Sequence, residues 1–343
     1  FGITLILIAS IIGGILYGWL ADLYGRRTVL MITIITYGIM TLLTGLSQNL
    51  MEFYIFRFLS GLGVGGEWGI GFSLLNEAWS EKTRGAAGGF LQSMYVIGSF
   101  VATAVGGLSV AYLGTILGWR MAYIILGIAS LVLSTLRWWM PESKLWLQFN
   151  ELKRTGKLPP NYIVRTPIVD IFSKNYARFT IFGTILAVGN LYGAYSFLSF
   201  MPTLFAIYFK IPVLIYTSMI LLAQIVGIIG YIFNGFLSDI LGRKTTALIY
   251  GIAAIISAIA FFYVASLRPH FTSILSFPLF YPYAAIYFFL GGFIGEFGVC
   301  LCEHFPTRMR AIASSFAFME GRVGSALAPI TVPIFASTPG IYL

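Results

Sequence analysis

Among the ionisable residues inside long apolar runs of this chain, four have side chains that could carry chemistry: Arg57, Glu67, Glu296 and Arg322. An ionisable group inside an apolar membrane helix costs roughly 2.5 kcal/mol or more unless it is paired, protonated or hydrated. A carboxyl that is neutral when buried and ionised when wet can couple proton binding to a conformational change. We therefore predict proton coupling for Glu67, Glu296 and Arg57, and anion binding for Arg322.

A structural interpretation stays open beside each functional one. Glu67 lies two to three helical turns from Glu77, so it could instead pair with an arginine near a helix end. Glu320 and Arg322 do not share a helix face at a spacing of i, i+2, which leaves Arg322 free to point into a central cavity. The alternative for Arg322 is a buried pair with a carboxylate of another helix.

A charged turn occurs twice. The segment from Gly18 to Thr28 recurs from Gly235 to Thr245, offset by 217 residues, with six of eleven positions identical. Its glycines permit a tight reversal, Asp22 can accept hydrogen bonds from a helix N-terminus, and Arg26 can bridge to a carboxylate on another helix. A turn that only anchors the topology is the alternative.

A second repeated pair, from Glu77 to Arg84 and from Glu303 to Arg310, places a carboxylate and an arginine seven residues apart. Such charges can make and break contacts between helix ends. We predict that gating involves Asp22, Gly25, Arg26, Arg27, Glu77, Arg84, Asp239, Gly242, Arg243, Glu303 and Arg310.

The elements that must position these residues are membrane helices. Of the 343 residues, 58% are hydrophobic and 10% are charged, whereas soluble domains are about 45–50% apolar and about 25% charged. The sequence predicts an all-α integral membrane protein, and apolar runs long enough to span a bilayer fall at 1–21, 29–47, 50–75, 86–113, 120–140, 177–208, 213–238, 245–267, 280–302 and 311–336.

A polar, basic stretch at 141–176 divides these ten runs into two sets of five. We predict an N-terminal helix bundle at 1–140, a cytoplasmic linker at 141–176 and a C-terminal bundle at 177–343. If the loop that carries Arg26 is cytoplasmic, most of the 21 Lys and Arg residues lie on that side, as the positive-inside rule requires. The predicted location is a cell membrane, plasma or inner, crossed many times.

The repeated turn resembles the signature of the major facilitator superfamily, which lies between helices two and three and again between helices eight and nine. The run from Arg57 to Gly66 resembles the pattern of the family's fourth helix, and Pro141-Glu142-Ser143 resembles the end of helix six in the sugar-porter-like branch. The resemblance implies the major facilitator fold, with two parallel-repeat bundles of a twelve-helix parent. By that register the bundles hold helices two to six and seven to eleven.

The run from Gly65 to Gly69 is similar to that of metabolite:proton symporters and of sialate and aromatic-acid carriers. The resemblance implies proton-coupled symport of a small organic anion, a carboxylate metabolite, by alternating access. A sugar or phosphate:proton symporter of the same superfamily is the alternative. Hexose carriers usually have Gln-Gln where this chain has Gly189-Asn190, and phosphate carriers have Tyr-Pro where it has Trp68-Gly69. The predicted substrate-binding residues are Arg322, Gln92, Asn190, Tyr95 and Tyr192.

Other classes of function fit less well. A membrane enzyme would need a nucleophile or an acid/base pair at reachable spacing, which the sequence does not offer, and a transporter-like sensor usually carries long soluble extensions. Cys300 and Cys302 point apart on a helix, and His270 and His304 are distant, so we expect no metal and no cofactor. The expected partners are a small-molecule substrate, protons and the lipid bilayer, without nucleic acid, and the expected oligomeric state is a monomer.

Overall fold

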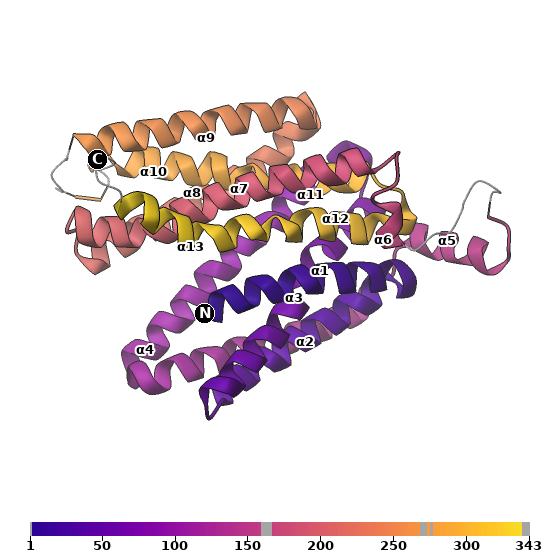
Figure 1. The fold of residues 1–343 in the computed structure, drawn as a ribbon, viewed down its shortest axis with the longest axis horizontal. Coiled ribbons are helices and arrows are strands. Elements are labelled where there is room, and N and C mark those ends of the chain that lie inside the picture. Colours follow the sequence, from indigo (N-terminus) through magenta and orange to yellow (C-terminus); the bar gives the residue numbers. More distant parts are fainter. Residues whose placement is uncertain (1, 159–166, 268–272, 275–276, 338–343) are drawn as a thin grey trace. The chain divides into compact units, whose positions relative to one another are not determined.

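The computed structural model describes residues 2–158, 167–267, 273–274 and 277–337, and every regular element in these ranges is a helix (Figure 1). Parts of the predicted linker (159–166) and of the predicted second bundle (268–272, 275–276 and 338–343) lie outside the described residues. The long helices are α1 (Gly2–Tyr24), α2 (Arg26–Leu46), α3 (Leu50–Ala78), α4 (Arg84–Leu136), α7 (Ala177–Thr203), α8 (Val213–Leu241) and α9 (Arg243–Ser266). The shorter ones are α5 (Lys144–Arg154), α6 (Pro167–Asp170), α10 (Phe280–Ile286), α11 (Ile294–Glu303), α12 (Arg310–Glu320) and α13 (Arg322–Ser337).

Each of the ten predicted apolar runs falls on helix. Within the described residues, seven helical stretches are long and apolar enough to cross a membrane. One of them, Glu81–Trp139, contains two predicted runs. It is interrupted at Gly114, whose φ of 75° lies in the left-handed region.

Three of the predicted runs are broken rather than continuous. Pro202 lies near the end of α7 and is followed by a π-helical turn, Leu204–Tyr208, since proline lacks the amide donor that a regular helix needs. A second π-helical turn, Tyr287–Gly291, follows α10. Gly321 separates α12 from α13, and a Cβ there would lie 2.5 Å from the Cβ of Ala187, so only glycine fits this approach of α7.

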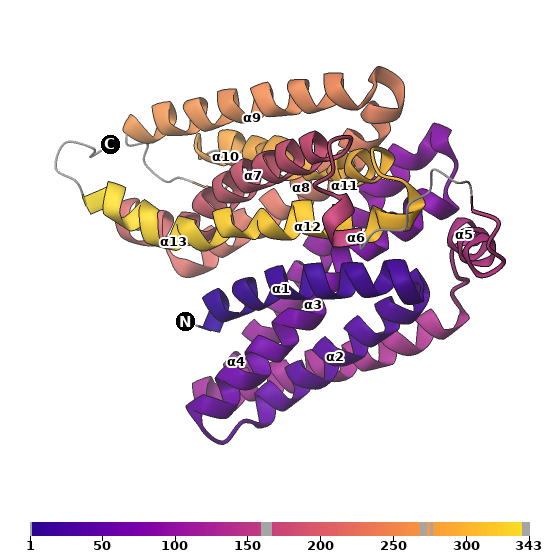
Figure 2. The ribbon, with the colours of Figure 1, turned by 45° about the vertical axis from the view of Figure 1, so that its right-hand side comes forward.

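The chain forms two compact units. The first comprises 1–80, 101–188 and 298–323, and the second comprises 81–100, 189–297 and 324–343. Helices α4 and α7 contribute residues to both units, and the segment 298–323 belongs to the first. The two bundles and the linker between them stay a prediction. Within the first unit, α1, α3 and α12 lie side by side (Figures 1 and 2).

Glycines allow the helices of the first unit to approach closely. A Cβ at Gly65 of α3 would lie 2.1 Å from the carbonyl oxygen of Ser10 on α1, and one at Gly63 would lie 2.8 Å from that of Thr33 on α2. Small residues at such crossings let helix backbones pack against each other in a membrane. The glycine-rich run of α3 therefore fixes which way the neighbouring side chains, Glu67 included, can face.

The described parts of the predicted linker are partly helical and belong to the first unit. Ser143 caps α5, and the indole of Trp146, which is buried, donates to the carbonyl of Asp22 at 3.1 Å. Beyond α6, Ile171 is fully buried against Phe305 and its neighbours, and Asp170 forms an ion pair with Arg308. The linker helices therefore lie against the charged end of α1 and the turn before α12.

Candidate functional site

Arg26 is the centre of a buried charge cluster in the first unit. Its side chain has no exposed surface, and its Nε and Nη2 donate to the two carboxylate oxygens of Glu77 at 3.1 and 3.0 Å. Asp22 provides a second carboxylate at 3.1 Å, and Nη1 donates to the carbonyl of Ala21. A buried guanidinium is tolerated only when its charge is paired and its donors are satisfied, which a two-point contact with a carboxylate achieves.

Glu77 joins this cluster to a segment 233 residues further along the chain. Arg310 donates from Nη1 to Glu77 at 3.1 Å and from Nε to the carbonyls of Cys302 and Phe305 at 3.0 and 3.1 Å. The Glu77 carboxylate has no exposed surface. Glu77 therefore pairs with two arginines that come from distant parts of the sequence.

Asp22 also caps α12. Its carboxylate oxygens accept hydrogen bonds from the backbone amides of Ala311 at 3.3 Å and Ile312 at 2.9 Å, in the first turn of that helix. A negative charge at a helix N-terminus satisfies free amides and interacts favourably with the helix dipole. The hydrogen bonds that the sequence predicts for Asp22 are therefore present.

The second copy of the charged turn makes the same kind of contact in the second unit. Asp239 at the end of α8 accepts hydrogen bonds from the amides of Gly85 and Ala86, both at 2.8 Å, in the first turn of α4. Arg243 lies 2.8 Å from the Asp239 carboxylate and also donates to Ser238. The internal repeat therefore reproduces a helix cap as well as a stretch of sequence.

The glycines of the two turns have backbone conformations that permit the tight reversal expected from the sequence. Gly25 has a φ of 104° and Gly242 a φ of 85°, both in the left-handed region that glycine adopts without strain. In the first copy, the carboxylate of Glu142 accepts from the amides of Arg26 and Arg27 at 3.0 and 3.1 Å and caps α2. A Cβ at Gly25 would lie 2.3 Å from that carboxylate.

The other predicted gating residues have less uniform surroundings. Arg27 is half-buried and donates to the backbone carbonyl of Trp138. Arg84 is half-buried at the start of α4, and Glu303 is exposed at the end of α11. These three residues lie at helix ends, as the sequence predicts.

Glu67 has a counter-ion within its own unit. Arg137, in the turn after α4, forms an ion pair with Oε1, and the hydroxyl of Thr33 on α2 donates to Oε2 at 2.9 Å. About a quarter of each charged side chain is exposed, 26% for Glu67 and 27% for Arg137. The geometry agrees with the structural ion pair that sequence reasoning left open, and the proton-coupling role of Glu67 stays a prediction.

The two other residues predicted for proton coupling differ from Glu67. Arg57 is half-buried, and its guanidinium lies 5.2 Å from the ring centre of Tyr123, a cation–π contact. Glu296 is only 2% exposed, and its backbone amide donates to the side chain of Asn234 at 3.0 Å. Glu296 is therefore the more deeply buried of the two predicted carboxyls.

Arg322 at the start of α13 is half-buried and donates from Nη1 to the hydroxyl of Ser10 on α1 at 3.0 Å. Across the described residues, no carboxylate lies within ion-pair distance of Arg322. A guanidinium has five donors. The donors of Arg322 that do not bond to Ser10, together with its positive charge, suit an anionic group.

The other predicted substrate-binding residues belong to the second unit. Asn190 donates to the carbonyl of Leu290, in the π-helical turn, at 3.3 Å, and its own side-chain oxygen is buried without a hydrogen bond. Tyr192 shares a hydrogen bond with Thr331 at 2.9 Å. Gln92 is buried, whereas Tyr95 is 61% exposed.

Sequence reasoning missed several contacts. Trp68 stacks on Phe318 of α12 with ring centres 3.6 Å apart and planes 9° from parallel. The capping role of Glu142 and the partners of Glu67 and Arg322 were also missed. The sequence contains no signal for these pairs, because they depend on which helix faces are turned toward each other.

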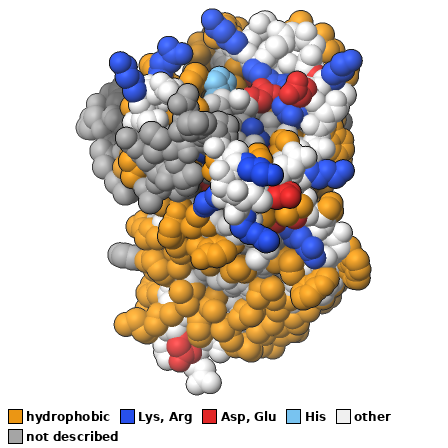
Figure 3. Space-filling view, turned by 90° about the vertical axis from the view of Figure 1, so that its right-hand side faces the viewer, with side chains coloured by type: hydrophobic (Ala, Val, Ile, Leu, Met, Phe, Trp, Pro, Cys, Tyr) orange, Lys and Arg blue, Asp and Glu red, His pale blue; other side chains and the backbone are white. Residues whose placement is uncertain are grey.

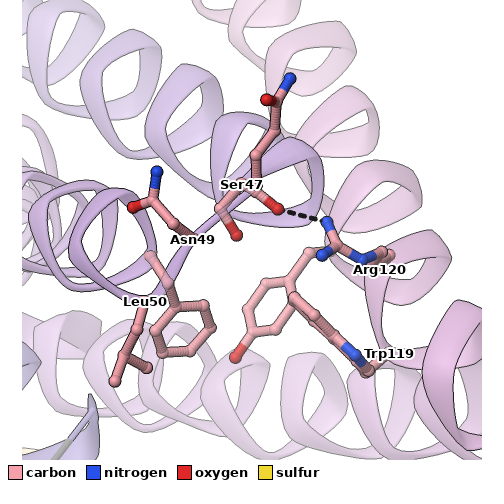
Figure 4. A pocket seen from close by; sticks show the side chains of 8 residues that line it. Ser47, Asn49, Leu50, Trp119 and Arg120 are labelled. Carbon is pink, nitrogen blue, oxygen red and sulfur yellow. Dashed lines mark hydrogen bonds between the residues drawn. The ribbon is translucent and has the colours of Figure 1, made fainter.

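Two cavities in the first unit have volumes of about 540 and 530 Å³. The first lies where α2 passes into α3, where Trp119 and Arg120 face Ser47, Asn49 and Leu50 (Figure 4). Arg120 donates to the carbonyls of Gly45 and Ser47 there. The second cavity lies between α2 and α5. Neither is lined by a predicted substrate-binding residue.

Comparison with known proteins identifies relatives along the whole chain. A family model described as Major Facilitator Superfamily matches residues 1–329. A probable 4-methylmuconolactone transporter of Cupriavidus pinatubonensis is 29% identical over 341 residues, which are 98% of this chain and 75% of the relative. A cis,cis-muconate transport protein of Acinetobacter baylyi is 28% identical over 341 residues, 97% and 77% of the two chains.

A solved structure has the same fold. The proton:xylose symporter XylE, bound to 6-bromo-6-deoxy-D-glucose, superposes with a TM-score of 0.78 over 98% of this chain and 78% of its own, at 19% identity. These matches confirm the predicted family resemblance and the predicted all-α membrane fold.

Proposed function

The chain belongs to the major facilitator superfamily, and on that basis we propose that it carries a small organic carboxylate together with a proton by alternating access. Membership makes it a multi-pass membrane transporter of a small molecule and not an enzyme. Three points are part of the proposal: that the substrate is a carboxylate, that a proton is carried with it, and how the chain is oriented in the membrane. We place the protein in a plasma or inner membrane, with the charged turns and the central linker in the cytoplasm.

The surroundings of Arg322 are the main support for a carboxylate substrate. Arg26 and Arg310 share the carboxylate of Glu77, whereas Arg322 donates to the neutral hydroxyl of Ser10. A partly buried guanidinium without a fixed counter-ion is stabilised by a transported anion, and a carboxylate matches its planar fork at two points. Gln92, Asn190, Tyr95 and Tyr192 are the remaining substrate candidates.

The names of the relatives support this choice. One relative is named for cis,cis-muconate, which is a carboxylate, and another for 4-methylmuconolactone. The likeness to the xylose symporter concerns the fold and does not favour a sugar.

Gating is assigned to the charged turns and their partners. In the first unit, Asp22, Arg26 and Glu77 bind the segment that carries Arg310 and the N-terminus of α12. Charge-assisted hydrogen bonds of this kind are strong when formed and can be exchanged for water when a helix end moves. In this assignment the transporter is closed on its cytoplasmic side when these contacts are formed, and it opens on that side when they are lost.

Proton coupling is assigned to Glu296. It is 2% exposed in an apolar helix, where binding or release of a proton changes the free-energy cost of keeping the side chain buried. Arg57 stays a candidate for the proton path.

Substrate binding and uptake in proteoliposomes test the proposal. The chain should accumulate a carboxylate from a panel of carboxylates, xylose and phosphate when a proton gradient is imposed. In Arg322→Lys the affinity for that carboxylate should fall by about tenfold or more, because a charge-assisted hydrogen bond contributes about 1.5–3 kcal/mol.

The matched control is Arg120→Lys, which changes another half-buried arginine that donates only to backbone carbonyls among the described residues. Its carboxylate affinity should equal that of the parent. Unchanged affinity in a folded Arg322→Lys variant, or accumulation of xylose or phosphate alone, would exclude the carboxylate assignment.

A further inference from the structure

The cavity of about 530 Å³ between α2 and α5 has an apolar wall and a basic end. Met31, Ile32 and Ile35 form the wall, and they fall on one face of α2 at a spacing of i, i+1 and i+4. Arg27 lines the other end, in the first turn of the same helix. At 1.5 Å per residue, Arg27 and Ile35 are about 12 Å apart along the helix axis.

Part of the apolar wall is exposed on a helix that could span a membrane. Ile32 and Ile35 are 46% and 38% exposed on α2, which is one of the helices long and apolar enough to span a membrane. In a membrane, side chains exposed along such a helix are covered by acyl chains rather than by water. The apolar part of the cavity, along Met31, Ile32 and Ile35, is therefore a suitable environment for the acyl chain of a lipid.

The arginine at the basic end is not held in an ion pair with a carboxylate among the described residues. Arg27 donates to the backbone carbonyl of Trp138, and within the described residues it takes part in no ion pair. Glu142 also lines the cavity, but its oxygens accept from the backbone amides of Arg26 and Arg27 at 3.0 and 3.1 Å, so its charge is engaged at the N-terminus of α2. The guanidinium of Arg27 is thus suited to a phosphate.

Helix α5 has the composition of an interfacial helix. Leu145, Leu147 and Leu152 are exposed on it, beside basic residues at both ends: Lys144, Lys153 and Arg154. Basic residues next to exposed apolar ones favour the surface of a membrane with anionic lipids. Figure 3 shows Lys and Arg side chains next to hydrophobic surface on the side of the molecule where α5 lies.

We propose that this cavity binds an anionic phospholipid, with its phosphate on Arg27 and an acyl chain along Met31, Ile32 and Ile35. Trp138 and Trp146 line the same cavity, and tryptophan is enriched where membrane proteins meet lipid headgroups. A zwitterionic lipid would fill the apolar part equally well but would leave the arginine without a net counter-charge.

Brominated phospholipids test the site, because bromine on an acyl chain quenches nearby tryptophans. The full chain is placed in phosphatidylcholine nanodiscs that contain increasing amounts of dibrominated phosphatidylglycerol or dibrominated phosphatidylcholine. Half-maximal quenching should need about fivefold less of the phosphatidylglycerol, the ratio expected for one basic residue at a membrane surface. In Arg27→Gln this ratio should fall to about one.

Lys153→Gln is the matched control, because it removes a basic residue of α5 that does not line the cavity. It should keep the preference for phosphatidylglycerol. Trp138→Phe should lower the preferential quenching, because only one of the two tryptophans that line the cavity, Trp146, then remains, and this variant keeps the test decisive if Arg27→Gln does not fold. Equal quenching by the two lipids, a preference unchanged in Arg27→Gln, or preferential quenching undiminished in Trp138→Phe would overturn the proposal.

Discussion

Two carboxyls in apolar helices, Glu67 and Glu296, have different surroundings in the structure. Glu67 is ion-paired with Arg137 and accepts a hydrogen bond from Thr33, and about a quarter of its side chain is exposed. Glu296 is only 2% exposed. We therefore expect Glu67→Gln and Glu296→Gln to have different effects, although both substitutions remove the same carboxylate charge.

We expect Glu296→Gln to abolish pH-driven accumulation of substrate and to retain substrate exchange, since glutamine keeps the shape and the hydrogen-bonding groups but cannot ionise. Counterflow and proton-driven uptake in the same proteoliposomes measure the two activities separately. If Glu296→Gln accumulates substrate like the parent, the proton site lies elsewhere.

Glu67→Gln should mainly lower stability. It leaves Arg137 without its counter-ion in a partly buried place, which costs about 1–3 kcal/mol, and proton-driven uptake by the folded fraction should persist. Thermal unfolding in detergent checks the first expectation. An unchanged unfolding temperature together with lost accumulation would transfer the coupling role from Glu296 to Glu67.

The first turns of α4, which belong to the second unit, are in backbone contact with α8. A Cβ at Gly89 would lie 2.4 Å from the carbonyl oxygen of Tyr231, and one at Gly235 would lie 2.3 Å from that of Gly85. Backbone atoms cannot move aside as the end of a flexible side chain can. The same crossing brings Asp239 to the first amides of α4, so the helix cap depends on the two glycines.

Gly89→Ala should therefore destabilise the protein by about 1–3 kcal/mol, the usual cost of an overpacked contact. Gly98→Ala on the same helix is the control, because nothing lies within 4 Å of a Cβ there. That substitution should be neutral or should stabilise the helix by up to about 1 kcal/mol. Equal unfolding temperatures for the two variants would show that α4 and α8 are not this close in the folded protein.

At the scale of the whole molecule, the cluster around Glu77 joins segments that are far apart in sequence. Cys302 lies at this junction: it has no exposed surface, and its carbonyl accepts a hydrogen bond from Arg310. If the cluster opens during transport, as we propose, this thiol becomes accessible to a water-soluble reagent. The chain contains only one other cysteine, Cys300.

We expect Glu77→Gln, in a Cys300→Ser background, to raise the rate of maleimide labelling of Cys302 by about tenfold or more. The substitution weakens two charge-assisted contacts, to Arg26 and Arg310, each worth about 1.5–3 kcal/mol. Glu81→Gln, an exposed carboxylate four residues further on, is the control and should label at the parent rate. The gating assignment fails if Glu77→Gln also labels at the parent rate.

The sequence by itself determined the helical architecture and the local form of the charged turns. Ten apolar runs predicted ten stretches of helix, because a chain in lipid must satisfy its backbone hydrogen bonds internally. The repeated glycines predicted a tight reversal, and Gly25 and Gly242 have left-handed backbone conformations there. The charged residues beside them predicted a helix cap from Asp22 and a carboxylate partner for Arg26, because a buried charge cannot stay unpaired.

Only the tertiary structure decided which partners these residues take. Glu67 pairs with Arg137, Arg322 bonds to Ser10, and Trp68 stacks on Phe318. Each of these contacts depends on how the helices are rotated and how closely they cross. Apolar periodicity carries little of that information in a membrane helix, since its lipid-facing and its packed faces are both apolar. The breaks at Gly321 and at the π-helical turns were likewise decided by contacts between helices, and so was the division into two compact units.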